Sequence, residues 1–179
     1  MSADSAAAAG RLPGIRRVVT GHREDGVGVV KGDKVMESYV SANQKFQGLS
    51  AGPIWRTGQL PVNDSNDETD GATREATGDF GLVVKGGTNL LFTDLAPGAT
   101  AGMHRTTSLD HNILISGKVL LIMEDGSETL VENPGDVVVQ RGTVHAWRNP
   151  GPEWVRWVTV VIDAQPAVVN GVALGPYVV

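Results

Sequence analysis

The second half of the chain is a series of short apolar runs separated by turns that contain glycine, proline or asparagine. Between Asn89 and Asp163 these runs recur roughly every 8 to 12 residues, which is the pattern of a β-sandwich or barrel. The chain also holds 23 glycines and 9 prolines, spread over many short clusters. Because both residues disfavour helix interiors and no helical stripe is present, the sequence predicts an all-β fold.

The remaining sequence divides into segments of different character. The first residues are small and polar, which predicts a disordered arm. Two strand-like runs, 15–20 and 27–31, flank a polar turn and predict a hairpin, and residues 61–79 form an acidic stretch expected to be a surface loop. Two runs around Ser116 and Gly117, at 111–115 and 118–123, carry a second hairpin signature. The expected organisation is a disordered arm (1–14), an N-terminal β extension with the acidic loop (15–79) and a barrel (80–179).

Composition excludes several classes of protein. The absence of cysteine excludes disulfides and thiolate metal sites. A net charge of -5 argues against binding to nucleic acid or to an anionic membrane through a basic face. No apolar run approaches the ~20 residues of a membrane span, and the first ten residues lack the features of a signal peptide. We therefore expect a cytoplasmic protein that acts on a small molecule.

Polar side chains gather on one face of an expected strand that follows a Pro-Gly turn. Because side chains alternate along a strand, His104 shares its face with Thr106, Asp110 and Asn112. The same alternation places His111 on the opposite face, pointing out of a barrel. His22, in the polar turn of the first hairpin, is expected to be solvated.

A later strand carries a second histidine, His145, on the same face as Trp147. If both faces point into one barrel, two imidazoles and one carboxylate converge. These are the ligand types of non-haem iron, manganese and zinc sites. They are also groups that can move protons.

Two motifs make the fold more specific. The first runs from Gly98 through His104 and Asp110 to Gly117, and resembles the cupin motif that reads Gly, five residues, His-x-His, three or four residues, Glu, six residues, Gly. The second has its glycines, histidine and asparagine at Gly135, Gly142, His145 and Asn149, and resembles the second cupin motif. This resemblance to the cupin superfamily implies a jelly-roll barrel, also described as a double-stranded β-helix, and a homodimer. Residues 16–22, 55–57, 103–110 and 139–149 are similar to those of a branch of small single-domain cupins of fungi and bacteria. Some members of that branch are encoded beside genes for secondary metabolites.

The chain departs from the metal-binding cupin pattern at two positions. Thr106 stands where those cupins have the second histidine, and Asp110 stands where they have glutamate. The resemblance therefore leaves His104, Asp110 and His145 as candidate ligands for one divalent ion (Zn, Fe, Mn or Ni). A threonine is a poor ligand for such ions, so both a metal-bound and a metal-free site remain open.

Three functions fit these residues. The first is acid–base lyase or isomerase chemistry, such as dehydration, decarboxylation or cyclisation, on an organic acid or a polyketide-like substrate. His104, Asp110 and His145 are its catalytic candidates. Burial is expected to raise the pKa of the aspartate, and neighbouring charges are expected to tune the histidine pair toward neutrality. The second is a non-haem iron dioxygenase, and the third is a non-catalytic cupin that binds a ligand. Residues expected to contact the substrate are Trp55, Arg56, Thr106, Asn112 and Trp147.

Overall fold

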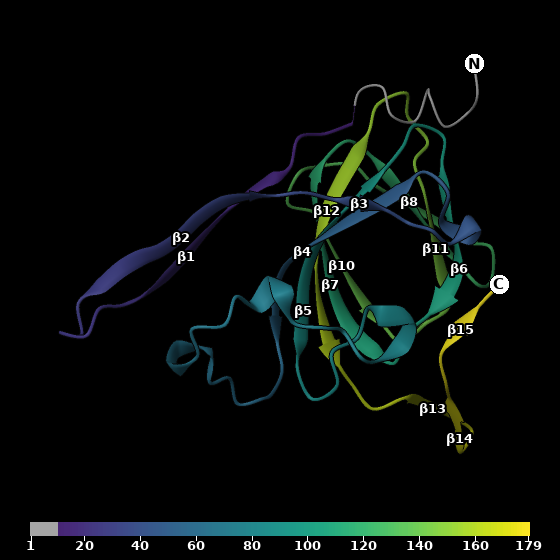
Figure 1. Ribbon diagram of the computed structural model, residues 1–179. Coiled ribbons are helices and arrows are strands. Elements are labelled where there is room, and N and C mark those ends of the chain that lie inside the picture. Colours follow the sequence, from purple (N-terminus) through teal and green to yellow (C-terminus); the bar gives the residue numbers. More distant parts are fainter. Residues whose placement is uncertain (1–10) are drawn as a thin grey trace.

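The computed structural model describes residues 11–179, which form two antiparallel β-sheets that face each other (Figure 1). The six-stranded sheet has the order β10–β7–β12–β5–β4–β3, and the five-stranded sheet has the order β15–β6–β11–β8–β9. The predicted all-β jelly-roll barrel is confirmed. Of the predicted disordered arm, residues 1–10 lie outside the described part of the chain.

The six-stranded sheet consists of β3 (Tyr39–Val40), β4 (Leu49–Thr57), β5 (Thr88–Leu95), β7 (Ser108–Ser116), β10 (Val137–Arg141) and β12 (Val155–Asp163). The five-stranded sheet consists of β6 (Thr100–Arg105), β8 (Val119–Met123), β9 (Glu128–Val131), β11 (His145–Arg148) and β15 (Tyr177–Val178). Two hairpins lie outside these sheets: β1 (Ile15–His22) with β2 (Gly28–Met36), and β13 (Ala167–Val169) with β14 (Val172–Leu174). Four short 3-10 helices occupy connections: η1 (Gln44–Phe46), η2 (Asp64–Asn66), η3 (Gly71–Thr73) and η4 (Asp79–Gly81).

The predicted hairpin around Ser116 and Gly117 is wrong. Both runs are strands, but β7 pairs with β10 and β12, whereas β8 pairs with β9 and β11 in the other sheet. Gly117 has φ 79°, a left-handed conformation that favours glycine. The chain therefore turns from one sheet into the other at this residue and does not fold back on itself.

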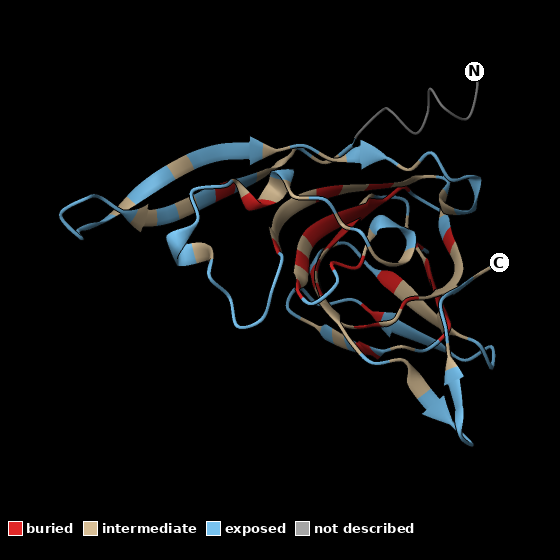
Figure 2. Ribbon diagram, turned by 60° about the horizontal axis from the view of Figure 1, so that its bottom comes forward, coloured by how far each residue is buried: buried red, intermediate tan, exposed pale blue. Residues whose placement is uncertain are grey.

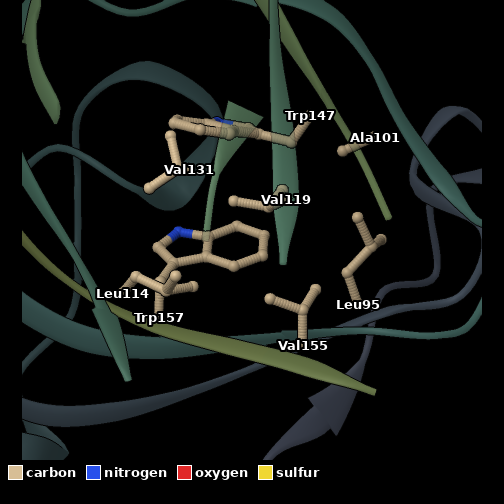
Figure 3. Packing of buried hydrophobic residues seen from close by; sticks show 8 residues of the cluster. All are labelled: Leu95, Ala101, Leu114, Val119, Val131, Trp147, Val155 and Trp157. Carbon is tan, nitrogen blue, oxygen red and sulfur yellow. The ribbon is translucent and has the colours of Figure 1, made fainter. Parts of the chain in front are cut away.

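Apolar side chains fill one part of the space between the sheets (Figure 3). This cluster contains Leu95, Ala101, Leu114, Val119, Val131, Trp147, Val155 and Trp157. Strand β12 shows how the filling changes along the barrel: Val155 belongs to the cluster, Trp157 belongs to the cluster and also lines a cavity, and Thr159 and Val161 line that cavity. The packed core thus supports one end of a hollow barrel.

The β1–β2 hairpin projects from the barrel, and most of its residues are exposed (Figures 1 and 2). Its one buried residue, Arg17, donates hydrogen bonds to both carboxylate oxygens of Asp70, at 2.6 and 2.8 Å. The acidic loop lies at the surface as predicted, but its aspartates are paired: Asp70 also accepts from Lys34, and Asp64 accepts from Arg74. These ion pairs connect the hairpin to the loop. None of the helices in residues 11–179 has the length and apolarity that a membrane span requires.

Candidate active site

A cavity of about 210 Å³ lies between the two sheets. Its polar lining comes from both sheets and includes His104 and His145 on one side and Asp110, Asn112 and Thr159 on the other. Ser41, Thr93 and Thr106 add hydroxyl groups, and the rest of the lining is apolar, with aromatic side chains from Phe46, Phe80, Trp147 and Trp157. The cavity therefore combines polar groups with an aromatic surface, as small-molecule sites do.

The two histidines lie side by side because β6 and β11 are neighbouring strands that pair His104 directly with His145. Their ring centroids are 4.4 Å apart. The Nδ1 atom of His104 lies 2.8 Å from the Gly102 carbonyl oxygen, and that of His145 lies 3.0 Å from the Thr143 carbonyl oxygen. Since a carbonyl oxygen can only accept, each Nδ1 carries the proton and each Nε2 carries a lone pair.

Both imidazoles are neutral at neutral pH. Burial lowers the pKa of His104, and it lowers that of His145 to about 3, where the neighbouring His104 adds to the effect. A proton that enters the pair is therefore held by His104. The expected neutrality of the histidines agrees with these directions, but its main cause is burial and not the neighbouring charges.

Asp110 lies on β7 in the opposite sheet, with only 6% of its surface exposed. Burial raises its pKa to about 6, and a hydrogen bond from Ser108 opposes that effect. Within residues 11–179, its buried Oδ1 has no hydrogen-bond partner. The expected rise in this pKa is confirmed, and the carboxyl group exists in both protonation states near neutral pH.

Two further polar side chains of β7, Ser108 and Asn112, are buried on the same face as Asp110. The Thr106 hydroxyl, just before the strand, lies 2.8 Å from that of Ser108, and Thr159 donates to the side-chain carbonyl of Asn112 at 2.7 Å. These bonds fix the orientations of the side chains that line the cavity. His111 takes no part in the lining, since it alternates to the outer face between the buried Asp110 and Asn112.

A row of rings runs from η1 past the histidines of the five-stranded sheet to β12 of the six-stranded sheet. Phe46 packs edge-on against His104 with centroids 5.4 Å apart, and His145 packs edge-on against Trp147 at 5.7 Å. Trp147 in turn lies 5.6 Å from Trp157. Trp147 was predicted as a lining residue, but Phe46, Phe80 and Trp157 were missed, although strand alternation places Trp157 on the same face as Thr159.

Trp55 and Arg56, two of the expected substrate contacts, do not lie in this cavity. The indole nitrogen of Trp55 donates to Asp64 at 2.5 Å, and Arg56 donates to the backbone carbonyl of Arg74. Both side chains therefore hold the acidic loop against β4. These side chains turn to the acidic loop because it places carboxylate and carbonyl acceptors beside β4.

The predicted metal ligands do not come together as a set. No group of three His, Asp or Glu residues in positions 11–179 lies close enough to hold a metal ion. His104 and His145 present two imidazole nitrogens, but Asp110 approaches from the other sheet and Thr106 occupies the position of a third imidazole. Two nitrogens without a third strong ligand do not fit the three- or four-ligand sites typical of these ions.

Comparison with known proteins agrees with this architecture. Residues 91–161 match the cupin domain family (Cupin_2). The chain is 31% identical to oryzines biosynthesis cluster protein J of Aspergillus oryzae over 92% of this chain and 91% of that protein. It is 32% identical to the cupin-domain-containing oxidoreductase fogC of Aspergillus ruber, over 93% of this chain and 82% of that protein.

Among solved structures, the polyketide cyclase RemF of Streptomyces resistomycificus has a similar fold, with a TM-score of 0.50 and 14% identity. The alignment covers 78% of this chain and 82% of the cyclase. The two facing sheets, the two histidine-bearing motifs and the near full-length sequence similarity together show that this chain belongs to the cupin superfamily.

Proposed function

We propose that this cupin catalyses proton transfer on a small neutral carbonyl compound, in a lyase, isomerase or cyclase reaction. The observation that carries the proposal is the pairing, in one apolar cavity, of neutral imidazoles with a buried carboxyl group whose pKa is about 6. A neutral imidazole that can accept a proton and a buried carboxyl group that can donate one are the two partners that general acid–base catalysis requires. Relatives named as oxidoreductases support an enzymatic role, and the similar cyclase is an example of an enzyme with this fold.

In this reaction His104 is the base. Its Nε2 lone pair removes a proton from the carbon beside a carbonyl group, and the electron pair of that C–H bond forms a carbon–carbon double bond. The carbonyl π electrons move to oxygen, where protonated Asp110 donates its proton. The proton now on His104 returns to a different carbon to give an isomer, or it protonates a β-hydroxyl group that leaves as water to give a dehydrated product. Where the enol carbon attacks a second carbonyl group, the oxygen of that group takes the proton and a ring forms. In each case the first carbonyl group re-forms and the enol proton returns to Asp110.

The lining also bears on the substrate class. Within residues 11–179, the side chains around the cavity include no lysine or arginine. A carboxylate substrate would enter an apolar space beside Asp110 without a cation to balance its charge, which is unfavourable. A neutral polyketide-like ketone is therefore favoured over an organic acid.

The test is protein-catalysed hydrogen exchange into an enolisable ketone. The probe is 2-tetralone in deuterium oxide, followed by NMR at the carbon positions beside the carbonyl. We expect exchange above the buffer rate, and a loss of about a hundredfold in His104→Ala, the usual size of a general-base contribution. The matched control is His22→Ala, which removes an exposed histidine of the β1–β2 hairpin and is expected to leave the rate unchanged. Exchange at the buffer rate with the wild-type protein, or an unchanged rate in His104→Ala, would contradict the proposal.

A redox reaction is the second candidate, because relatives such as virC of Hypocrea virens, 33% identical, are named oxidoreductases. Oxygen consumption with 2-tetralone and added Fe(II) that disappears in His145→Ala would support this candidate. Binding of the ketone with neither exchange nor oxygen consumption would support the third function, a non-catalytic ligand-binding cupin.

A further inference from the structure

Phe80 combines three unusual properties. Its backbone has φ 54° and ψ 21°, in the left-handed region that a bulky side chain seldom adopts. Its side chain lines the cavity, yet 55% of the residue is exposed to solvent. A large apolar ring that both lines a cavity and contacts water lies at the cavity mouth.

The turn that carries Phe80 explains the backbone conformation. The Leu82 amide donates to the Asp79 carbonyl at 2.9 Å, and the two central residues, Phe80 and Gly81, both have positive φ. Two positive φ values define a type I′ turn, which prefers Asn-Gly at its centre. Gly81 fits this preference, whereas phenylalanine at the first central position is strained.

Hydrogen bonds on both sides hold the strained turn in place. Asp79 accepts from the Thr107 amide at 2.7 Å, and the Gly78 amide donates to the Val83 carbonyl at 2.8 Å. Thr107 joins β6 to β7, the two strands that carry His104 and Asp110. The turn is thus attached to the segment that connects His104 to Asp110. Backbone strain that persists beside a candidate site is a reason to look for a function of the strained residue.

We propose that Phe80 determines specificity by stacking on a planar aromatic ligand at the cavity mouth. Phe46, Trp147 and Trp157 supply further aromatic surface in the same cavity, so a planar ligand held there has aromatic side chains besides Phe80 to contact. Ligand binding removes the exposed ring of Phe80 from water, which is favourable, and offset stacking adds to that gain. The proposal rests on the proposed function for the identity of the cavity, and it narrows the substrate to carbonyl compounds that carry an aromatic ring.

The test compares stability with binding in Phe80→Asn. Asparagine is well suited to the left-handed conformation, so the urea midpoint is expected to rise. The probe is 2-naphthol, whose affinity, measured by fluorescence titration, is expected to fall by about tenfold, as loss of an aromatic contact at about 1.4 kcal/mol predicts. Phe80→Leu keeps the strain and an apolar side chain but loses the aromatic face, and is expected to weaken 2-naphthol binding without raising the urea midpoint.

Unchanged 2-naphthol affinity in Phe80→Asn would overturn the proposal, and so would full affinity in Phe80→Leu. The affinity for 2-naphthol does not depend on turnover. If the Phe80 variants bind 2-naphthol more weakly but the wild-type protein does not exchange hydrogen into 2-tetralone, only the proposed reaction is rejected. If exchange occurs, Phe80→Asn is expected to raise KM and to leave kcat within about twofold, because a binding contact shared by ground and transition states affects KM alone.

Discussion

Replacing Asp110 with asparagine tests whether the cavity keeps a carboxyl group away from water. The pKa of this group is about 6 in the folded protein against 3.8 for an ordinary aspartate, because it is buried. The folded state therefore binds the proton more tightly than the unfolded state does. Ionisation of Asp110 destabilises the fold as the pH rises from about 4 to above about 6.

The magnitude follows from the two pKa values. One pKa unit corresponds to about 1.4 kcal/mol, so the rise from 3.8 to about 6 costs the folded protein about 3 kcal/mol once Asp110 is ionised. The asparagine side chain has no charge to bury, and Asp110→Asn is therefore expected to be more stable than wild type near neutral pH. About 2 kcal/mol of this difference is expected to disappear near pH 4. At that pH Asp110 is protonated in the folded protein, and it is close to its pKa in the unfolded chain, so little charge is buried on folding.

The assay is urea unfolding of both proteins at about pH 4 and about pH 7.5, followed by fluorescence of the buried Trp147 and Trp157. At each pH, the free energy of unfolding of wild type is subtracted from that of the variant, and the two differences are then compared. This comparison removes the effects of other titrating groups, which both proteins share. The control is Asp136→Asn, because backbone hydrogen bonds from Asn133 and Glu132 lower the pKa of Asp136 and predict the opposite sign. If the stability gained by Asp110→Asn is the same at both pH values, or is larger near pH 4, the reasoning that burial raises the pKa of Asp110 is refuted.

Three further predictions concern stability and assembly. Asp70→Asn is expected to destabilise the protein by about 2 kcal/mol, because it leaves the buried Arg17 guanidinium without its carboxylate; an unchanged urea midpoint would contradict this. Trp157→Ala removes a ring that is 5% exposed from the core cluster and is expected to cost about 3–5 kcal/mol in a urea titration, whereas a loss below about 1 kcal/mol would mean that the core closes over the gap. The homodimer stays a prediction, supported by the projecting β1–β2 hairpin, since an isolated two-stranded ribbon is only marginally stable in water; a monomeric mass in light scattering would refute it.

Prediction from the sequence was most successful where the signal is local. Strand alternation alone placed His104, Asp110 and Asn112 on the inner face of the barrel and His111 on the outer face, as the structure shows. The rise in the pKa of Asp110 also followed from local reasoning, because a carboxyl group on an inner face loses water.

Prediction failed where the answer depends on which distant segments meet. The runs on either side of Gly117 look like a hairpin, but their partners come from strands elsewhere in the chain. Trp55 was expected at the cavity, yet its indole nitrogen meets a carboxylate of the acidic loop. The strained position of Phe80 was also missed, because a turn conformation held by an amide on another connection leaves no mark in the turn's own residues.

The sequence by itself determined the all-β class, the cupin resemblance and the inward faces of the catalytic candidates, because turn spacing and period-two alternation are properties of consecutive residues. Only the tertiary structure decided that His104 and His145 form a close pair and that Asp110 approaches from the opposite sheet. Alternation specifies the face on which a side chain lies, whereas the neighbour it meets across the barrel depends on strand order and register. In residues 11–179 that arrangement leaves the two imidazoles without a third His, Asp or Glu close enough to complete a metal site.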